Sequence, residues 1–237
     1  MQRRNIIIGG VAALACAAPI APVAAATAKT PAKAKTVTVR VEGLGKTLLT
    51  ATSVSAKKFT RAGHACWATS AAAALNAATK GKWTGSWSSY GFYVTSIFGE
   101  TDNYNTTGSY WEMFVNGVAA QKGVCDPTLA ETQTVKPGDT VLFAAVGSTE
   151  APGLPIEIAK VQTSRKKLAV TVDYVSAKGK LLPLKGATVT LGHAKATTGK
   201  NGVATLKSAK LRSGTIVASE KGYIRDERAL TAAVRAA

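Results

Sequence analysis

Alternating hydrophobic and polar residues predict β-strands in the first half of the chain. Val37, Val39 and Val41 fall on one side of an extended segment and polar residues on the other, which is typical of a half-buried strand. Residues 47–54 follow a glycine turn and are expected to pair with this first strand as a hairpin. Similar patterns predict further strands at residues 91–99, 109–115 and 140–146.

One segment, "TSAAAALNAATKG" at residues 69–81, predicts a helix instead. Thr69 or Ser70 can cap its first turn, its alanines and leucine have high helix propensity, and Gly81 ends it. Asn116-Gly117 is typical of a type I′ hairpin turn, because both central residues of that turn need a positive φ. A sheet with one helix predicts an α+β domain over residues 37–150.

Short strands separated by glycine turns predict a different architecture in the second half. These strands are expected at residues 168–175, 186–192, 202–206, 214–223 and 228–234. Their length and spacing indicate a small all-β sandwich over residues 167–237. Residues 147–155 are rich in glycine and proline, so we expect a linker between the domains that covers residues 151–166.

The N-terminal residues predict an exported protein. A positive start, an apolar run and a small-residue pattern indicate a secretory signal peptide at residues 1–26. Arg3-Arg4 also fits a twin-arginine signal and Cys16 a lipoprotein site, and both alternatives stay open. Residues 27–36 predict a flexible leader rich in lysine, alanine and proline. The mature chain is expected to be secreted, without a transmembrane span, and attachment to the cell surface is an open alternative.

Charge differs between the two predicted domains. Residues 37–150 carry a net charge of +1, and residues 160–237 carry +12. A domain with that excess attracts polyanions, so the expected partner is an anionic cell-wall polymer, with another envelope protein as the alternative. Specific nucleic-acid recognition is not expected, because no aromatic residues lie between the scattered lysines. Ordinary solubility would explain the same lysines.

Cysteine usage agrees with export. Only Cys66 and Cys125 remain after removal of the signal peptide, and an even pair in an exported chain predicts a disulfide. Such a bridge would tie the start of the helix to the loop after the Asn116-Gly117 hairpin. A reactive Cys66 beside His64 is the alternative, but residues two apart tend to diverge and no activating group is evident.

These segments together resemble a known family. The stretches "GHACWATSAAAALNAATKGKWTGSW", "GFYVTSIFGE", "YWEMFVNGVAAQKGVCD" and "VKPGDTVLF" occur in the order seen in exported bacterial domains of unknown function, family 4430. That family is related to the C-terminal β-domain of transcobalamin and intrinsic factor. The resemblance covers about residues 36–146 and implies a β-grasp-like fold that holds a ligand. Residues 167–237 resemble the prealbumin- or immunoglobulin-like accessory modules of exported proteins.

Aromatic residues are concentrated in the resemblance region. Residues 82–117 hold ten of the fifteen aromatic residues, among glycine, serine, threonine and asparagine. Core packing explains some of them, and Phe92, Phe98 and Trp111 fit that role. Exposed aromatics with polar neighbours are instead typical of surfaces that bind flat ligands or sugar faces. The candidate ligand-binding residues are Trp83, Trp87, Tyr90, Tyr93, Tyr104, Tyr110 and Trp111.

The sequence offers little for catalysis. Two histidines lie in different predicted domains without metal-ligand spacing, and Glu100 and Asp102 are expected to be solvated. No catalytic residue and no metal site are predicted. We therefore expect a non-catalytic ligand-binding protein at or outside the cell envelope. A structural or adhesive wall component is the first alternative, and capture of cobalamin or a related tetrapyrrole with a partner chain, which the resemblance implies, is the second.

Overall fold

The computed structural model describes residues 36–89, 91–120, 123–125, 134–147, 153–164, 167–207 and 213–230. The predicted signal peptide and nearly all of the predicted leader lie outside these residues. The described residues belong to one compact unit. We call residues 36–147 the first lobe and residues 153–230 the second lobe. The described chain is mostly β-strand with two short helices.

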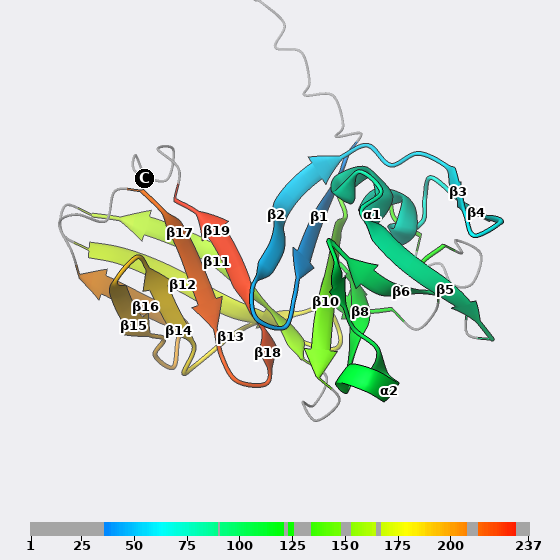
Figure 1. Cartoon of the computed structure of the whole chain (residues 1–237). Coiled ribbons are helices and arrows are strands. Elements are labelled where there is room, and N and C mark those ends of the chain that lie inside the picture. Colours follow the sequence, from blue (N-terminus) through cyan, green and yellow to red (C-terminus); the bar gives the residue numbers. More distant parts are fainter. Residues whose placement is uncertain are drawn as a thin grey trace, which may run out of the picture. The chain divides into compact units, whose positions relative to one another are not determined.

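The first lobe is built on a five-stranded sheet in which segments far apart in the sequence are neighbours (Figure 1). The strand order is β2-β1-β10-β8-β9. In the middle, β1 and β10 run parallel, and the other pairs are antiparallel. The strands are β1 (Val37–Glu42), β2 (Thr47–Val54), β8 (Ser109–Val115), β9 (Val118–Ala119) and β10 (Thr140–Gly147). The bounds of β1, β2, β8 and β10 match the predicted strands closely, and β9 was not predicted.

Helix α1 (Ala71–Thr79) begins and ends where its sequence predicts. The Ser70 hydroxyl accepts a hydrogen bond from the backbone N–H of Ala73 at 3.2 Å and thus satisfies a donor at the first turn. Lys80 ends the helix in the left-handed conformation, with a φ of 53°. Ala71, Ala72, Ala74 and Leu75 are buried in the core that the helix shares with the first sheet, and these small alanine side chains allow a close approach.

Two smaller groups of strands and a short helix complete the first lobe. The hairpin β3 (Phe59–Arg61) and β4 (His64–Cys66) precedes α1. A three-stranded sheet follows it, made of β5 (Trp83–Ser88), β6 (Gly91–Ile97) and β7 (Glu100–Thr101). The short helix α2 (Tyr104–Thr107) then leads into β8. The inner face of the first sheet, α1 and the buried residues of β5 and β6 share one hydrophobic core.

Strand β10 is buried on both faces, which explains its continuous run of apolar residues. Val141 and Phe143 face the core that contains α1. Leu142, Ala144 and Val146 belong to a separate apolar cluster that includes Ile224 of the second lobe. A strand covered on both faces loses the alternation of a half-buried strand.

The second lobe contains two sheets that bury their inner faces in one hydrophobic core (Figure 1). One sheet has the order β13-β12-β11-β18, with β16 also paired to β12, and the other has the order β15-β14-β17-β19. The strands of the first are β11 (Leu154–Thr163), β12 (Lys167–Val175), β13 (Leu181–Pro183), β16 (Val203–Lys207) and β18 (Tyr223–Ile224). Those of the second are β14 (Thr188–Leu191), β15 (Ala194–Thr197), β17 (Thr215–Ser219) and β19 (Asp226–Ala229).

The predicted linker at residues 151–166 is wrong for most of its length, because β11 occupies Leu154–Thr163. This strand pairs with β12 and buries Ile156 and Ile158 in the second core. A shift in register between Ile158 and Lys160 breaks its alternation. The nearby glycines and prolines therefore mark the approach to the strand rather than a long linker.

A buried ion network joins the first sheet to the segment around β18 and β19. Glu42 is fully buried, accepts hydrogen bonds from Thr47 Oγ1 at 2.7 Å and Arg225 Nε at 3.0 Å, and lies 3.6 Å from Arg40 Nε. Arg40 also pairs with Asp226. Burial raises the pKa of Glu42, and the two guanidinium groups oppose that rise.

Candidate functional site

The predicted site residues fall into two groups, and the first group is core. Trp83 is only 3% exposed and Trp111 8%. The prediction that Trp83 lies on an exposed loop is wrong, because it begins β5, opposite Ile97 of β6, and faces the core. Polar neighbours such as Thr84 and Ser86 sit on the other face of the same strand, so local composition was a poor guide to burial.

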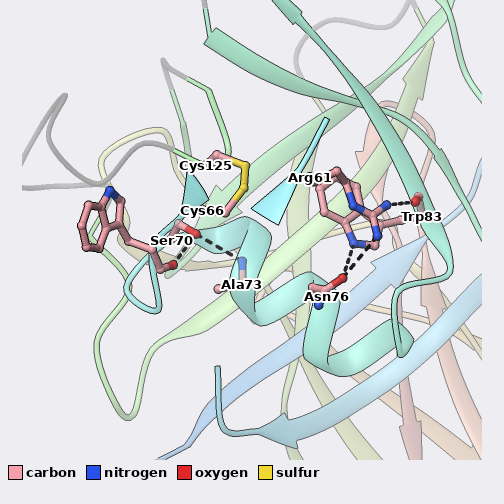
Figure 2. The surroundings of a disulfide bond; sticks show 8 residues. Arg61, Cys66, Ser70, Ala73, Asn76, Trp83 and Cys125 are labelled. Carbon is pink, nitrogen blue, oxygen red and sulfur yellow. Dashed lines mark hydrogen bonds between the residues drawn. A yellow bond between two sulfur atoms is a disulfide. The ribbon is translucent and has the colours of Figure 1, made fainter. Parts of the chain in front are cut away.

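Trp83 is held by a polar cluster at the C-terminal part of α1. The Arg61 guanidinium lies 4.2 Å from the centre of the Trp83 ring and also donates to the Trp83 carbonyl. Trp83 Nε1 donates to Asn76 Oδ1 at 3.2 Å. Figure 2 shows Arg61, Asn76 and Trp83 together, and the bridge between Cys66 and Cys125 beside the first turn of α1. The structure thus confirms the predicted disulfide.

The second group of predicted residues is exposed. Trp87 is 37% exposed, and its ring packs against the ring of His64 at 4.0 Å and that of Phe92 at 5.3 Å. Phe92 is the cross-strand partner of Trp87 on β6. Its side chain is buried, so it supports the indole ring on the side that faces the core. The contacts with two neighbouring rings restrict Trp87 while leaving part of its surface accessible.

Three of the predicted tyrosines are also exposed. Tyr93 lies on the outer face of β6, opposite Ser86, and is 46% exposed. Tyr104 opens α2 and is 62% exposed, and its ring lies 6.5 Å from that of Tyr110 on β8. Tyr90 lies outside the described residues. We call Trp87, Tyr93, Tyr104 and Tyr110 the exposed aromatic set.

A small cavity of about 180 Å³ lies between β6, β8 and the segment that leads to Cys125. Its lining comes from Ser88, Gly91, Phe92, Tyr93, Val94, Trp111, Glu112, Met113, Ala120, Gly123 and Val124. Two members of the predicted site, Tyr93 and Trp111, therefore meet in one cavity. We call this the Trp111 cavity.

The wall of the Trp111 cavity is fixed by backbone contacts next to the disulfide. Val124 N donates to Phe92 O at 2.8 Å, and Ala72 N donates to Val124 O at 2.9 Å. A Cβ on Gly123 would lie 2.5 Å from Phe92 N, so only glycine allows this close approach of the chain to β6. The bridge from Cys66 to Cys125 holds the end of the same segment.

Polar groups of the Trp111 cavity have unusual surroundings. Trp111 Nε1 is buried and has no hydrogen-bond partner in the described structure. Burial raises the pKa of the Glu112 carboxyl, while a hydrogen bond with Tyr110 opposes the rise. Burial and the neighbouring Glu112 charge raise the pKa of Tyr110. A buried N–H without a partner costs free energy of folding, and a carboxyl with a raised pKa is a common feature of functional sites.

Sequence reasoning missed several exposed rings. His64 was considered only as a partner of a reactive cysteine, yet it packs against Trp87. Trp67 is 49% exposed, with the Lys58 amine 4.2 Å from its ring centre. Phe98, expected in the core, is exposed because it occupies a turn with a φ of 52°. The neighbours of Trp67 include Ala65, Cys66 and Ala68, so local composition gives no signal of its exposure.

Possible catalytic and metal-binding groups are engaged in structural contacts. Asp102, expected to be solvated, is buried and accepts a hydrogen bond from the buried Ser109 Oγ at 2.5 Å. Glu100 accepts a hydrogen bond from the backbone of Leu44 instead of lying beside Asp102. Among the described residues, no group of three or more His, Cys, Asp or Glu side chains is arranged to hold a metal ion.

Within the described ranges, neither helix has the length and apolar composition needed to cross a membrane.

Comparisons with known proteins agree with the resemblance in the first lobe. Residues 68–146 match the model of a family described as "Domain of unknown function (DUF4430)", which confirms the predicted resemblance to that family. Nothing in these comparisons confirms a relation to transcobalamin. A solved structure from Ruminococcus gnavus ATCC 29149, described as a "putative metal binding protein", aligns at 17% identity and a TM-score of 0.34, covering 48% of this chain and 97% of its own. No curated protein matches the chain.

Proposed function

We propose that this chain is an exported, non-catalytic ligand-binding protein that acts at or outside the cell envelope and binds its ligand through the exposed aromatic set. The observation that carries the proposal is the exposure of large aromatic rings that the fold holds in place. Trp87 packs against His64 and Phe92, and the ring of Tyr104 lies 6.5 Å from that of Tyr110. Rigid aromatic rings gain contact area at low entropic cost, which favours recognition of a flat ligand or a sugar face.

The strand order supports a finer fold assignment as part of this proposal. A mixed sheet with parallel central strands β1 and β10 and one helix packed on it is the arrangement expected of a β-grasp. The two sheets of the second lobe, with a common core, fit a small sandwich of the immunoglobulin or prealbumin type. Both assignments describe scaffolds that present a site rather than the chemistry of the site.

The second lobe is proposed to associate with anionic polymers of the cell wall. Lys167 and Lys207 are directly opposed on β12 and β16, and both are exposed. Lys160, opposite Thr171 on the neighbouring strand, is also exposed. Like charges directly across a sheet destabilise it, so a polyanion that neutralises them would be bound favourably. Salt screens exposed charges, so a high salt concentration should weaken this association and release the protein from cells.

Isothermal titration calorimetry with variants of single exposed residues tests the proposal. Trp87→Ala and Tyr104→Ala should lose affinity for the ligand that the wild type binds, with unchanged circular dichroism. Leu182→Ala is the matched control, because Leu182 is an exposed apolar residue of the second lobe. Equal affinity in all three variants would refute a site on the exposed aromatic set and would favour a structural wall component.

A further inference from the structure

Two polar side chains on the outer face of β8 form a hydrogen-bonded pair. Tyr110 and Glu112 are two residues apart on the strand, so both side chains lie on the face opposite to Trp111. The Tyr110 hydroxyl donates a hydrogen bond to the Glu112 carboxyl. On the paired strand β10 they lie beside Val146 and Ala144, which are buried. The half-buried carboxyl is therefore positioned by Tyr110 and partly shielded from water.

Helix α2 brings a second tyrosine ring to this pair. The helix packs against β8 (Figure 1), and the ring of its first residue, Tyr104, lies 6.5 Å from that of Tyr110 with an angle of 54° between the planes. The rings are therefore not stacked face to face, and each keeps accessible surface. The two rings and the Glu112 carboxyl thus surround one exposed place on the first lobe.

A chain of hydrogen bonds fixes the position of α2. The Thr107 hydroxyl donates to the Asn103 carbonyl at 2.9 Å and lies 2.7 Å from the Ser109 hydroxyl. The Ser109 hydroxyl in turn donates to the buried Asp102 carboxyl. The helix and its Tyr104 are therefore held in place before a ligand arrives, which lowers the entropic cost of binding.

The two rings suit a cation. The face of a tyrosine ring carries negative charge density, and it attracts a cation that lies within about 6 Å of the ring centre. Because the centres of the Tyr104 and Tyr110 rings are 6.5 Å apart, one cation can lie within that range of both.

The carboxyl completes the site for a cation. Glu112 supplies a full negative charge and an acceptor for a charged donor, which makes a stronger hydrogen bond than a neutral pair. Burial raises the pKa of Glu112, and a bound cation would stabilise the ionised form that burial disfavours. An ammonium group meets these requirements, because it carries a positive charge and several N–H donors.

Resting on the proposed function, we propose that Tyr104, Tyr110 and Glu112 form a subsite for the protonated amine of an amino sugar in a wall glycan. The ammonium group lies between the two rings and donates a hydrogen bond to the Glu112 carboxyl. The apolar face of the sugar packs against the Tyr104 ring, and the exposed Asn105 and Thr106 offer polar partners for the sugar hydroxyls. These polar partners favour an amino sugar over a lysine side chain, whose stem carries no hydroxyl group.

The charge of the first lobe is compatible with a cationic ligand. Residues 37–150 carry a net charge of only +1, whereas residues 160–237 carry +12. At about 0.15 M salt, exposed charges separated by more than about 8 Å are largely screened from each other. Binding measured at that salt concentration therefore reports on the subsite rather than on repulsion by the basic second lobe.

Calorimetry on the full mature chain tests this subsite with two sugars that differ in charge. The trimer of glucosamine carries amines that are protonated at about pH 6, and the trimer of N-acetylglucosamine has the same rings with each amine blocked. At about 0.15 M salt, the glucosamine trimer should bind at least about tenfold more tightly, because acetylation removes the charge that the rings and the carboxyl attract.

Variants of the site assign this preference to its residues. Glu112→Gln keeps the size of the side chain, and it should weaken binding of the glucosamine trimer by about 10- to 100-fold and remove most of the preference over the acetylated trimer. Tyr104→Leu should weaken it by about two- to tenfold, because one ring is lost. Glu157→Gln makes the same change at an exposed carboxylate of β11 and should bind both trimers as the wild type does. An unchanged indole N–H signal of Trp83, which bonds to Asn76, shows that each variant is folded.

Nuclear magnetic resonance of the tyrosine rings then locates the contact. The ring signals of Tyr104 and Tyr110 should shift when the glucosamine trimer is added. Those of Tyr174 and Tyr223, which pack against each other in the second lobe, should stay in place and serve as the internal control.

Each contrary outcome has a distinct meaning. Equal affinity for the two trimers would overturn the subsite and leave binding by the exposed aromatic set intact. A preference for the glucosamine trimer that survives in Glu112→Gln would place the amine elsewhere and would overturn it too. Binding of trilysine with shifts at Tyr104 and Tyr110, but of neither trimer, would replace the sugar with a peptide and overturn the inference. No binding of either trimer would also overturn it, while the proposed function would still be decided by its own titration against other ligand classes.

Discussion

Removal of the Cys66–Cys125 disulfide should affect stability and ligand binding together. The two cysteines are 59 residues apart, and both are buried. In the chain-entropy model, a bridge that closes a loop of this length stabilises the fold by about 4 kcal/mol. A domain of this size has a total unfolding free energy of about 5–15 kcal/mol, so a Cys66→Ala/Cys125→Ala variant should remain folded but only marginally stable.

Urea unfolding followed by tryptophan fluorescence measures this loss, because all four tryptophans lie in the first lobe. The wild type under non-reducing conditions is the reference. A decrease in unfolding free energy of less than about 1 kcal/mol would refute the argument that the bridge restricts the unfolded chain.

The Cys66→Ala/Cys125→Ala variant also tests whether the disulfide supports ligand binding. Val124, next to Cys125, bonds to Phe92 and lines the Trp111 cavity. Without the bridge this wall should open more often, so the variant should bind the ligand more weakly even where it is fully folded. Unchanged affinity would show that the backbone bonds of Val124 alone hold the wall.

Three further predictions concern other parts of the fold. Ser70→Ala removes the cap of α1 and should lower the unfolding free energy by about 1 kcal/mol in thermal or urea unfolding, and an equally stable variant would contradict the role of the cap. Arg225→Leu removes one of the cations beside the buried Glu42 and should cost about 2–3 kcal/mol near neutral pH. Burial raises the pKa of Glu42 above its ordinary value of 4.5, so at or below that pH the carboxyl is protonated in both the folded and the unfolded chain. The loss of stability should therefore be small there and should grow as the pH rises. A loss that does not depend on pH would contradict the role of the Glu42 charge. Lys207→Glu replaces a like-charge pair with Lys167 by an opposite-charge pair, and should raise the unfolding free energy by about 0.2–1 kcal/mol while weakening retention on an anionic column; stronger retention would contradict the assignment of this face.

Local signals in the sequence predicted the parts of the fold that depend on local chemistry. The cap at Ser70, the end of α1 before Gly81, and the positive φ values of Asn116 and Gly117 follow from residue types at fixed positions, whereas the left-handed Lys80 was not predicted. The disulfide followed from two cysteines in a chain expected to be exported. Such features require no knowledge of what packs against them.

The burial of the aromatic residues could not be predicted in the same way. Trp83 and Trp87 have similar polar neighbours, yet one faces the core and the other lies at its edge. Their difference depends on the pairing of β5 with β6 and on the β3–β4 hairpin that contacts both rings. Phe98 is exposed because it lies in the turn after β6, and the exact end of a strand is a weak signal in sequence.

The most direct test of ligand binding in the first lobe is a tryptophan-fluorescence titration of the purified mature protein. Cobalamin and a panel of neutral, anionic and amine-bearing wall glycans should be added separately, because together they cover the ligand classes considered. Our account predicts a saturable change with one of these ligands and a response that is lost in Trp87→Ala. A flat response to every ligand would contradict it and would indicate that the exposed rings belong to a structural component of the cell surface.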